Sequence, residues 1–273
     1  MSKFRLILIA ILSAVALFSG LMLLKTTLDY KTAEKEYDQL NQFTQPNVSK
    51  EVEVEEVQPK EEEPEEEIEE LARNYNRSDF PDIDIDFEGL KQVNPDVVGW
   101  VYVGAVDISY PVVQGTDNDF YLHQTFEGKK NAAGCIFMDY EVNKDLSSYN
   151  TFVYGHNMKN GSMFGKLKYF VWNEGTYDKD HYIYFFTPDM IYRYEIFSYY
   201  LDEVKSKMYY TCDNFAQYQT YLEEATKKSL KECDAKASDK DNIITLVTCS
   251  GAGSNKQRFF VHGTFVDRYI INE

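Results

Sequence analysis

The 273-residue sequence has no cluster of Lys and Arg side chains. Proteins that bind the nucleic-acid backbone need such a cluster, so this absence argues against nucleic acid as a partner. The formal net charge is −17, and it is uneven, because residues 51–70 hold twelve Glu and a single Lys. Hydrophobic residues make up 44% of the chain and aromatic residues 15%, which is ample for a folded core.

The sequence also has no closely spaced cysteine pair, although it contains Cys135, Cys212, Cys233 and Cys249. Structural zinc sites use pairs such as C-x₂₋₄-C, and no calcium-binding loop is recognisable either, so we expect no metal or other cofactor. An even cysteine count in an exported protein leaves disulfides possible. Cys212 and Cys233 flank a predicted helix that would separate them by roughly 25 Å, too far for a bridge.

Only one long hydrophobic run is present, from Leu6 to Leu24, and it follows the cations Lys3 and Arg5. A helix of this length spans roughly the 30 Å hydrocarbon core of a membrane. Cations before the run favour an N-terminus in the cytoplasm. Residues 1–25 therefore predict a cytoplasmic start and a single-pass signal anchor in the cell membrane. A signal peptide cleaved near residues 14–16 is the alternative, and either way the body lies outside the cytoplasm.

Residues 26–75 predict an extracellular acidic stalk that is largely disordered. Helical spacing is weak in residues 26–50, and Pro59 and Pro64 interrupt the acidic strip at residues 51–70. A cation-binding segment is the functional alternative to this solvated spacer.

Residues 76–273 predict a mainly β domain, a closed or nearly closed barrel with added helices and no internal repeat. Runs rich in Val, Ile, Tyr and Phe predict eight strands, at residues 98–103, 107–114, 133–139, 150–155, 181–187, 190–203, 243–248 and 258–268. Helices are expected at residues 87–93, 163–170 and 213–230, the last capped by Asp213 or Asn214.

One of the four cysteines has an unusual setting. Cys249 ends an apolar strand, and a turn-rich segment separates it from Arg258 on the next strand. A hairpin would place these two residues opposite each other, about 5 Å apart at Cβ. A nearby cation favours the nucleophilic thiolate, and an arginine can donate hydrogen bonds to the oxyanion of acyl transfer.

A catalytic acid or base would have to come from four histidines. His156 follows a strand and a glycine and enters a loop, where catalytic groups are commonly displayed. His181 begins a strand and His262 lies within one, so both fit packing or surface roles. His123 has no such context.

Together these residues resemble the sortase family, and class B in particular. Thr245-Leu246-Val247-Thr248-Cys249 matches the TLxTC signature, and Arg258 matches the arginine that follows it. The segment from Tyr154 to Phe164 is similar to the histidine segment of that class. The resemblance covers roughly residues 80–270. It implies an eight-stranded β-barrel with an N-terminal helix and a long helix between strands six and seven.

The resemblance further implies a cysteine transpeptidase with His156, Cys249 and Arg258 as catalytic residues. It would cleave a C-terminal sorting signal of the NPxTx or LPxTG kind at Thr in secreted proteins. It would then pass the acyl chain, through a thioester, to an amine of a peptidoglycan precursor or to a pilin lysine. The segment between Cys249 and Arg258 is richer in glycine than in class B members, which leaves the substrate preference open.

Two other functions remain open from the residues alone. A cell-wall cysteine peptidase would share the nucleophile, but papain-like enzymes place Cys before His, and caspases need Q-A-C-[RQG]-G around the cysteine. A non-catalytic, membrane-anchored binding domain would leave Cys249 as a buried structural residue.

Overall fold

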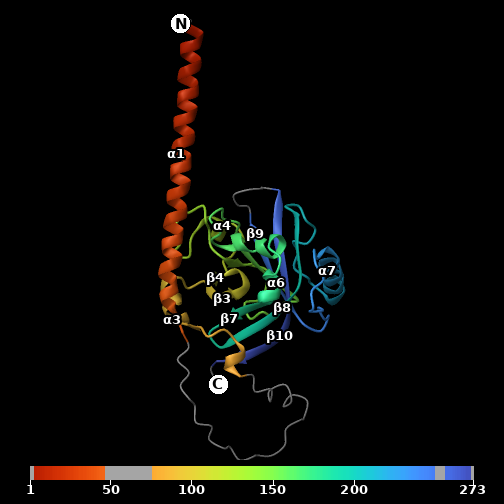
Figure 1. The fold of residues 1–273 in the computed structure, drawn as a ribbon. Coiled ribbons are helices and arrows are strands. Elements are labelled where there is room, and N and C mark those ends of the chain that lie inside the picture. The colour runs from red at the N-terminus through yellow and green to blue at the C-terminus, as the bar shows by residue number, and fades with distance from the viewer. Residues whose placement is uncertain (1–2, 47–75, 250–255, 272–273) are drawn as a thin grey trace, which may run out of the picture.

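Eight strands close into a barrel in the order β10-β8-β7-β3-β4-β5-β6-β9, which confirms the predicted fold class (Figure 1). This computed structural model describes residues 3–46, 76–249 and 256–271, with only the backbone of Cys249. The strands are β3 (Val97–Val103), β4 (Ile108–Val113), β5 (Phe137–Met138), β6 (Asn150–His156), β7 (Tyr182–Phe186), β8 (Met190–Glu203), β9 (Ile243–Cys249) and β10 (Gln257–Ile270).

The predicted strand at residues 133–139 is much shorter in the structure. Only Phe137–Met138 form β5, which pairs parallel with β4 and antiparallel with β6. Gly134 adopts a left-handed φ of 58°, which ends extended backbone on its N-terminal side. The Cys135 N–H donates to the Tyr121 carbonyl instead of to a strand.

Short helices surround the barrel, and α7 is the longest of those that follow β3. They are α3 (Phe87–Val93), α4 (Phe120–His123), α5 (Lys168–Trp172), α6 (Thr176–Lys179) and α7 (Phe215–Lys228), with 3₁₀ turns η1 (Asn41–Phe43), η2 (Arg77–Asp79), η3 (Gly104–Val106) and η4 (Phe164–Lys166). The predicted helix at residues 163–170 is divided between η4 and α5. Asn214 caps α7, since its side chain accepts a hydrogen bond from the Gln217 N–H at 3.1 Å. As expected, α7 lies between the sixth and seventh strands of the barrel.

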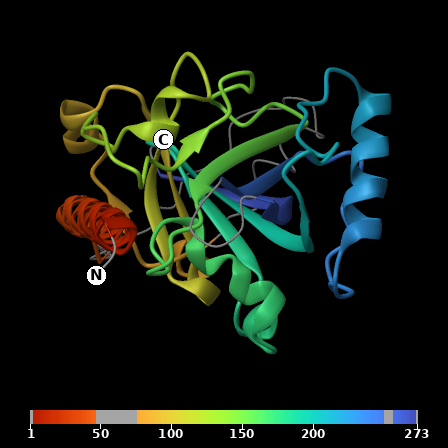
Figure 2. The ribbon, with the colours of Figure 1, turned by 90° about the horizontal axis from the view of Figure 1, so that it is seen from above.

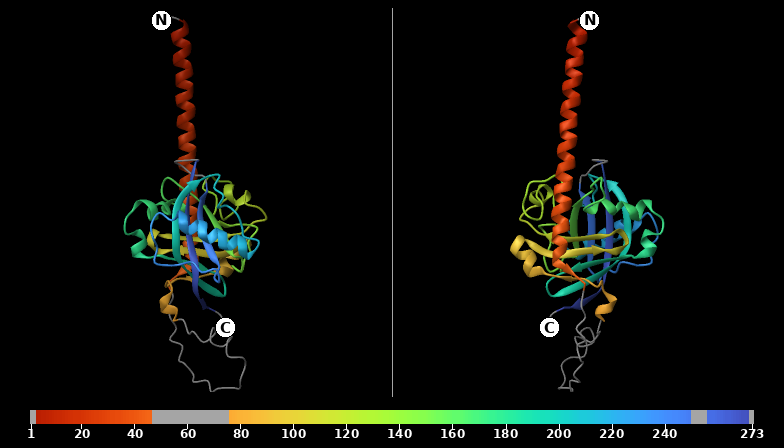
Figure 3. Two further views of the ribbon diagram at one scale, coloured as in Figure 1. Left: turned by 90° about the vertical axis from the view of Figure 1, so that its right-hand side faces the viewer. Right: turned by 60° about the vertical axis from the view of Figure 1, so that its left-hand side comes forward.

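The N-terminal helix α1 (Lys3–Leu40) is longer than the apolar run that begins it. It is the one helix among the described residues that is long and apolar enough to cross a membrane. Its C-terminal part lies against the barrel, on the side opposite α7, and its N-terminal half projects beyond the barrel (Figures 2 and 3). Ala33, Glu36, Tyr37 and Leu40 are buried there.

The first part of the predicted stalk therefore differs from our expectation, because residues 26–40 are helical and packed. Ala33, Tyr37 and Leu40 recur at spacings of four and three, which places them on one helix face. Three residues are too few to predict from the sequence that this helix face is buried. The burial becomes evident only from the surface of the barrel against which the face packs. After η1, β1 (Thr44–Gln45) pairs with β2 (Asp84–Ile85). The acidic strip at residues 51–70 lies outside the described residues.

Candidate active site

The strand register brings the three predicted site residues to one end of the barrel. β6 and β9 are parallel neighbours, and His156 is the partner of Cys249 in their ladder. β9 and β10 are antiparallel, and their ladder ends at the pair Val247 and Phe260. Continuing this register by two residues would place Cys249 opposite Arg258. Neighbouring strands are about 4.8 Å apart, so the three backbones are adjacent.

The β9–β10 ladder changes its hydrogen bonding just before this site. The Phe259 N–H donates to the Thr248 side-chain hydroxyl at 2.9 Å. Residues 243–248 of β9 are buried throughout, which holds the strand in the barrel wall up to its last residue. The nucleophile candidate thus follows a rigid strand, as a preorganised site requires.

His156 is buried, with 7% of its surface exposed, and its Nε2 lies 2.8 Å from the Leu122 carbonyl oxygen. A carbonyl can only accept, so this contact places a proton on Nε2 and leaves Nδ1 as the basic nitrogen. Gly134 lies behind the ring. A Cβ at Gly134 would come within 2.8 Å of His156 Cδ2 and 2.7 Å of the Leu122 oxygen, so only glycine fits.

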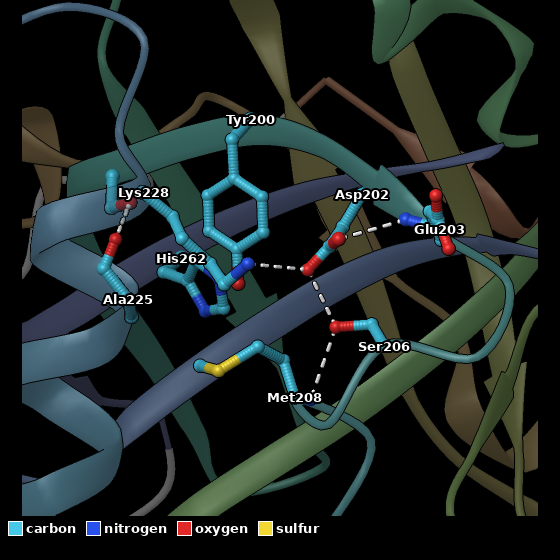
Figure 4. A network of polar contacts seen from close by, with 9 residues as sticks. Tyr200, Asp202, Glu203, Ser206, Met208, Ala225, Lys228 and His262 are labelled. Carbon is cyan, nitrogen blue, oxygen red and sulfur yellow. Dashed lines mark hydrogen bonds and ion pairs between the residues drawn. The ribbon is translucent and has the colours of Figure 1, made fainter.

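Arg258 is also buried, with 8% of its surface exposed, and its Nη1 donates to the Gln257 carbonyl at 2.9 Å. In the ladder between β10 and β8, the residue opposite Arg258 is Asp202 on β8. The Asp202 carboxylate accepts from the Ser206 hydroxyl at 2.6 Å and lies 2.9 Å from the Lys228 ammonium (Figure 4). In the part of the chain that the structure describes, Arg258 forms no ion pair. The carboxylate of Asp202, which lies opposite it, is paired with Lys228 instead.

The protonation of Asp202 fits this arrangement. Partial burial raises the pKa of the carboxyl, but hydrogen bonds from Ser206 and Lys228 outweigh that effect and bring the pKa below its ordinary value. The carboxylate is therefore charged and bound to α7 through Lys228, and the guanidinium of Arg258 keeps donors for a substrate oxygen.

The other three histidines have the settings that the sequence indicated. His123 is exposed, with its ring 3.8 Å from the Asp119 carboxylate. His181 stacks on Tyr177. His262 is fully buried, and burial lowers its pKa to about 3, so it is neutral.

The remaining cysteines are poor nucleophiles. Cys135, Cys212 and Cys233 are free thiols in this structure. Burial raises the pKa of Cys135 and of Cys212 to about 12, which keeps both thiols protonated. Among the described residues, no group of three His, Cys, Asp or Glu side chains could hold a metal ion.

Sequence reasoning missed the residues that support His156. Gly134 carried a usable signal, because a glycine inside a predicted strand indicates a bulge or a close approach. The Leu122 carbonyl carried none, since any residue provides one. Tyr37 belongs to the segment that we assigned to the stalk.

Comparison with known proteins agrees with this geometry. A family model described as Sortase domain matches residues 101–266. Sortase B of Listeria monocytogenes is 35% identical over 188 residues, which cover 66% of this chain and 73% of that protein. A Staphylococcus aureus sortase B–substrate complex is 33% identical, with a TM-score of 0.61 over 66% of this chain and 84% of that one. Sortase B of B. anthracis, in complex with AAEK1, is 28% identical, with a TM-score of 0.67 over 88% of this chain and 99% of that one.

Proposed function

Because this chain belongs to the sortase family of cysteine transpeptidases, we propose that it cleaves a C-terminal sorting signal at Thr and transfers the acyl chain to an amine. The observation that carries the proposal is the strand register, which makes His156 and Cys249 partners and continues to Arg258. A cysteine, a histidine and an arginine are the groups that thioester-mediated acyl transfer needs.

In the first half-reaction, the Cys249 thiolate attacks the Thr carbonyl carbon and forms the S–C bond. The C–N bond then breaks, and the His156 imidazolium gives its proton to the departing amine. The product is a thioester between Cys249 and the substrate. In the second half-reaction, the acceptor amine attacks this thioester, neutral His156 takes the proton, and Cys249 leaves as the thiolate.

Arg258 stabilises the oxygen that becomes negative in both tetrahedral intermediates. A buried guanidinium is effective here because water does not screen it, and arginine keeps its charge at all relevant pH values. The Asp202–Lys228 pair supports this role, because it keeps the opposed carboxylate from occupying Arg258.

The proposed donors are secreted proteins whose C-terminal signals are of the NPxTx or LPxTG kind. The acceptor is an amine of a peptidoglycan precursor or a pilin lysine. The apolar half of α1 fits a single-pass anchor, with the barrel on the outer side of the cell membrane. The S. aureus sortase B solved with a substrate shares this fold, which supports a peptide substrate for the barrel.

The function is tested with the full chain in detergent micelles and labelled peptides of each signal type, with and without an amine acceptor. We expect cleavage and an amine adduct, and a thioester on Cys249 detected by intact mass. Replacement Cys249→Ala abolishes both products, and His156→Ala lowers the rate by at least about 100-fold.

The matched control is Cys212→Ala, since Cys212 is a free, protonated thiol; it retains the wild-type rate. Wild-type activity in Cys249→Ala would remove the proposed nucleophile. Cleavage that never yields an amine adduct would identify a peptidase instead.

A further inference from the structure

Three hydrogen bonds join the docked part of α1 to residues 121–135, which lie beside the barrel. The Asn131 side-chain amide donates to the Asp29 carbonyl at 3.0 Å. The Glu127 N–H donates to the Glu36 carboxylate at 3.0 Å. Both contacts join α1 to the loop that follows α4. The backbone–backbone hydrogen bonds that shape this loop lie in its own turns.

The third contact is buried and comes from Tyr37, whose hydroxyl donates to the Gly134 carbonyl at 3.2 Å. Tyr37 itself is 7% exposed. A tyrosine hydroxyl has a pKa near 10 and is protonated at neutral pH, so it can act as this donor. The titratable groups that face Tyr37 are Glu36, Tyr110 and Cys135, and burial keeps the Cys135 thiol uncharged.

The segment that α1 holds is the one that supports His156. Leu122 supplies the carbonyl that lies 2.8 Å from His156 Nε2, and Gly134 lies against the same edge of the ring, at Cδ2. The Cys135 N–H donates to the Tyr121 carbonyl at 2.9 Å. This bond joins the two ends of the segment, next to Leu122 and Gly134.

Tyr37 has a second contact, which leads to Asn157, the residue after His156. Its ring packs edge-on against Tyr110, with centroids 5.5 Å apart. The Tyr110 hydroxyl accepts from the Met163 N–H at 3.0 Å. Met163 forms a β-bridge with Asn157, the residue after His156. Tyr37 thus contacts Gly134, which lies beside the His156 ring, and Tyr110, which is linked through Met163 to the residue after His156.

We propose that the docked part of α1 is a supporting element of the active site, and that Tyr37 is the positioning residue through which it holds His156. The inference rests on the proposed function, because it takes His156 as the group that moves the protons. It follows that the way α1 docks on the barrel affects the position of His156 at the catalytic end.

The test compares Tyr37→Phe with the wild type, using the full chain in detergent and the peptide assay. Losing one hydroxyl contact lowers kcat about fivefold and changes KM by less than about twofold. The pH–rate profile of Tyr37→Phe differs from that of the wild type, because the His156 ring is held less firmly. The control is Tyr30→Phe, on the same helix, whose hydroxyl makes no hydrogen bond within the described residues; it behaves as wild type.

A second readout needs no substrate. The pH dependence of Cys249 alkylation, followed by mass spectrometry, reports on the His156 partner and shifts in Tyr37→Phe alone. Unchanged kcat and unchanged pH profiles in Tyr37→Phe would overturn the inference, even if the melting temperature falls, because Tyr37 would then act on folding only. Failure of the proposed function is separate, since wild type would then give no amine adduct while the alkylation profiles still test Tyr37.

Discussion

At the scale of single residues, His262 illustrates a histidine used for structure. It lies in β10, fully buried, with Nδ1 3.0 Å from the Thr245 hydroxyl and Nε2 3.0 Å from the Tyr200 hydroxyl. Its ring stacks on Tyr200 and on Phe260. Hydroxyls can donate or accept, so both ring nitrogens of the neutral imidazole are satisfied.

Burial lowers the folded-state pKa of His262 to about 3, and this predicts a pH-dependent stability. Below about pH 6.5, the His262 imidazole is protonated in the unfolded chain but stays neutral in the folded chain. Stability is therefore complete above about pH 6.5 and is lost as the pH falls toward 3, by about 1.4 kcal/mol per unit. Denaturant titrations check it: the wild type loses this stability between pH 6.5 and 5, whereas H262Q does not. Exposed H123Q is the control, and parallel curves for wild type and H262Q would contradict the prediction.

At the scale of elements, the end of α7 controls charge beside the candidate site. Lys228 lies in the last turn of α7 and pairs with Asp202 at the end of β8. Asp202 in turn opposes Arg258 on β10. Figure 4 shows the lysine reaching from the helix to the carboxylate, with Tyr200 beside it. Lys228 of α7 thus pairs with the Asp202 carboxylate, which would otherwise pair with Arg258.

Replacement Lys228→Met is expected to lower kcat/KM about tenfold, because Asp202 then pairs with Arg258 and competes with the substrate oxygen. The double replacement with Asp202→Asn restores most of the rate. Lys227→Met is the matched control, since Lys227 is exposed and pairs with Glu223 on its own helix. Steady-state kinetics with the peptide assay compare the wild type with these three variants. A double variant as slow as Lys228→Met would rule out competition by Asp202.

At the scale of the whole molecule, α1 determines how the barrel is oriented. The apolar run ends at Leu24, and the first barrel contact is at Asp29, about 8 Å further along the helix. The N-terminal half of α1 projects past the end of the barrel at which β9 finishes and β10 begins (Figures 1 and 3). If this half of α1 is the proposed membrane anchor, the candidate active site lies close to the membrane surface.

Deletion of residues 1–24 is expected to move the protein from the membrane fraction to the soluble fraction without changing the peptide-cleavage rate by more than about twofold. The docked part of α1 remains in this variant, so the support of His156 is kept. Fractionation and the peptide assay measure the two effects. A further deletion to residue 46 provides the comparison, and there the rate falls. Retention of the 1–24 deletion in membranes would contradict the anchor.

The sequence alone determined most of the barrel and the identity of the candidate site. Strand runs such as residues 190–203 are predictable because alternation, β-branched residues and aromatic residues act locally. Cys249, Arg258 and His156 were found because their types, order and spacing resemble a known family. The turn at Gly134 and the packing of residues 26–40 were not found, since each depends on a surface distant in the chain.

Only the tertiary structure decided what holds these residues in place. The pairing of His156 with Cys249 comes from the register of two strands far apart in sequence. Backbone position and close packing determine the roles of the Leu122 carbonyl, Gly134 and Tyr37. These roles cannot be predicted from the residue types. Local composition specifies which elements form, whereas long-range burial and hydrogen bonding determine which of them meet.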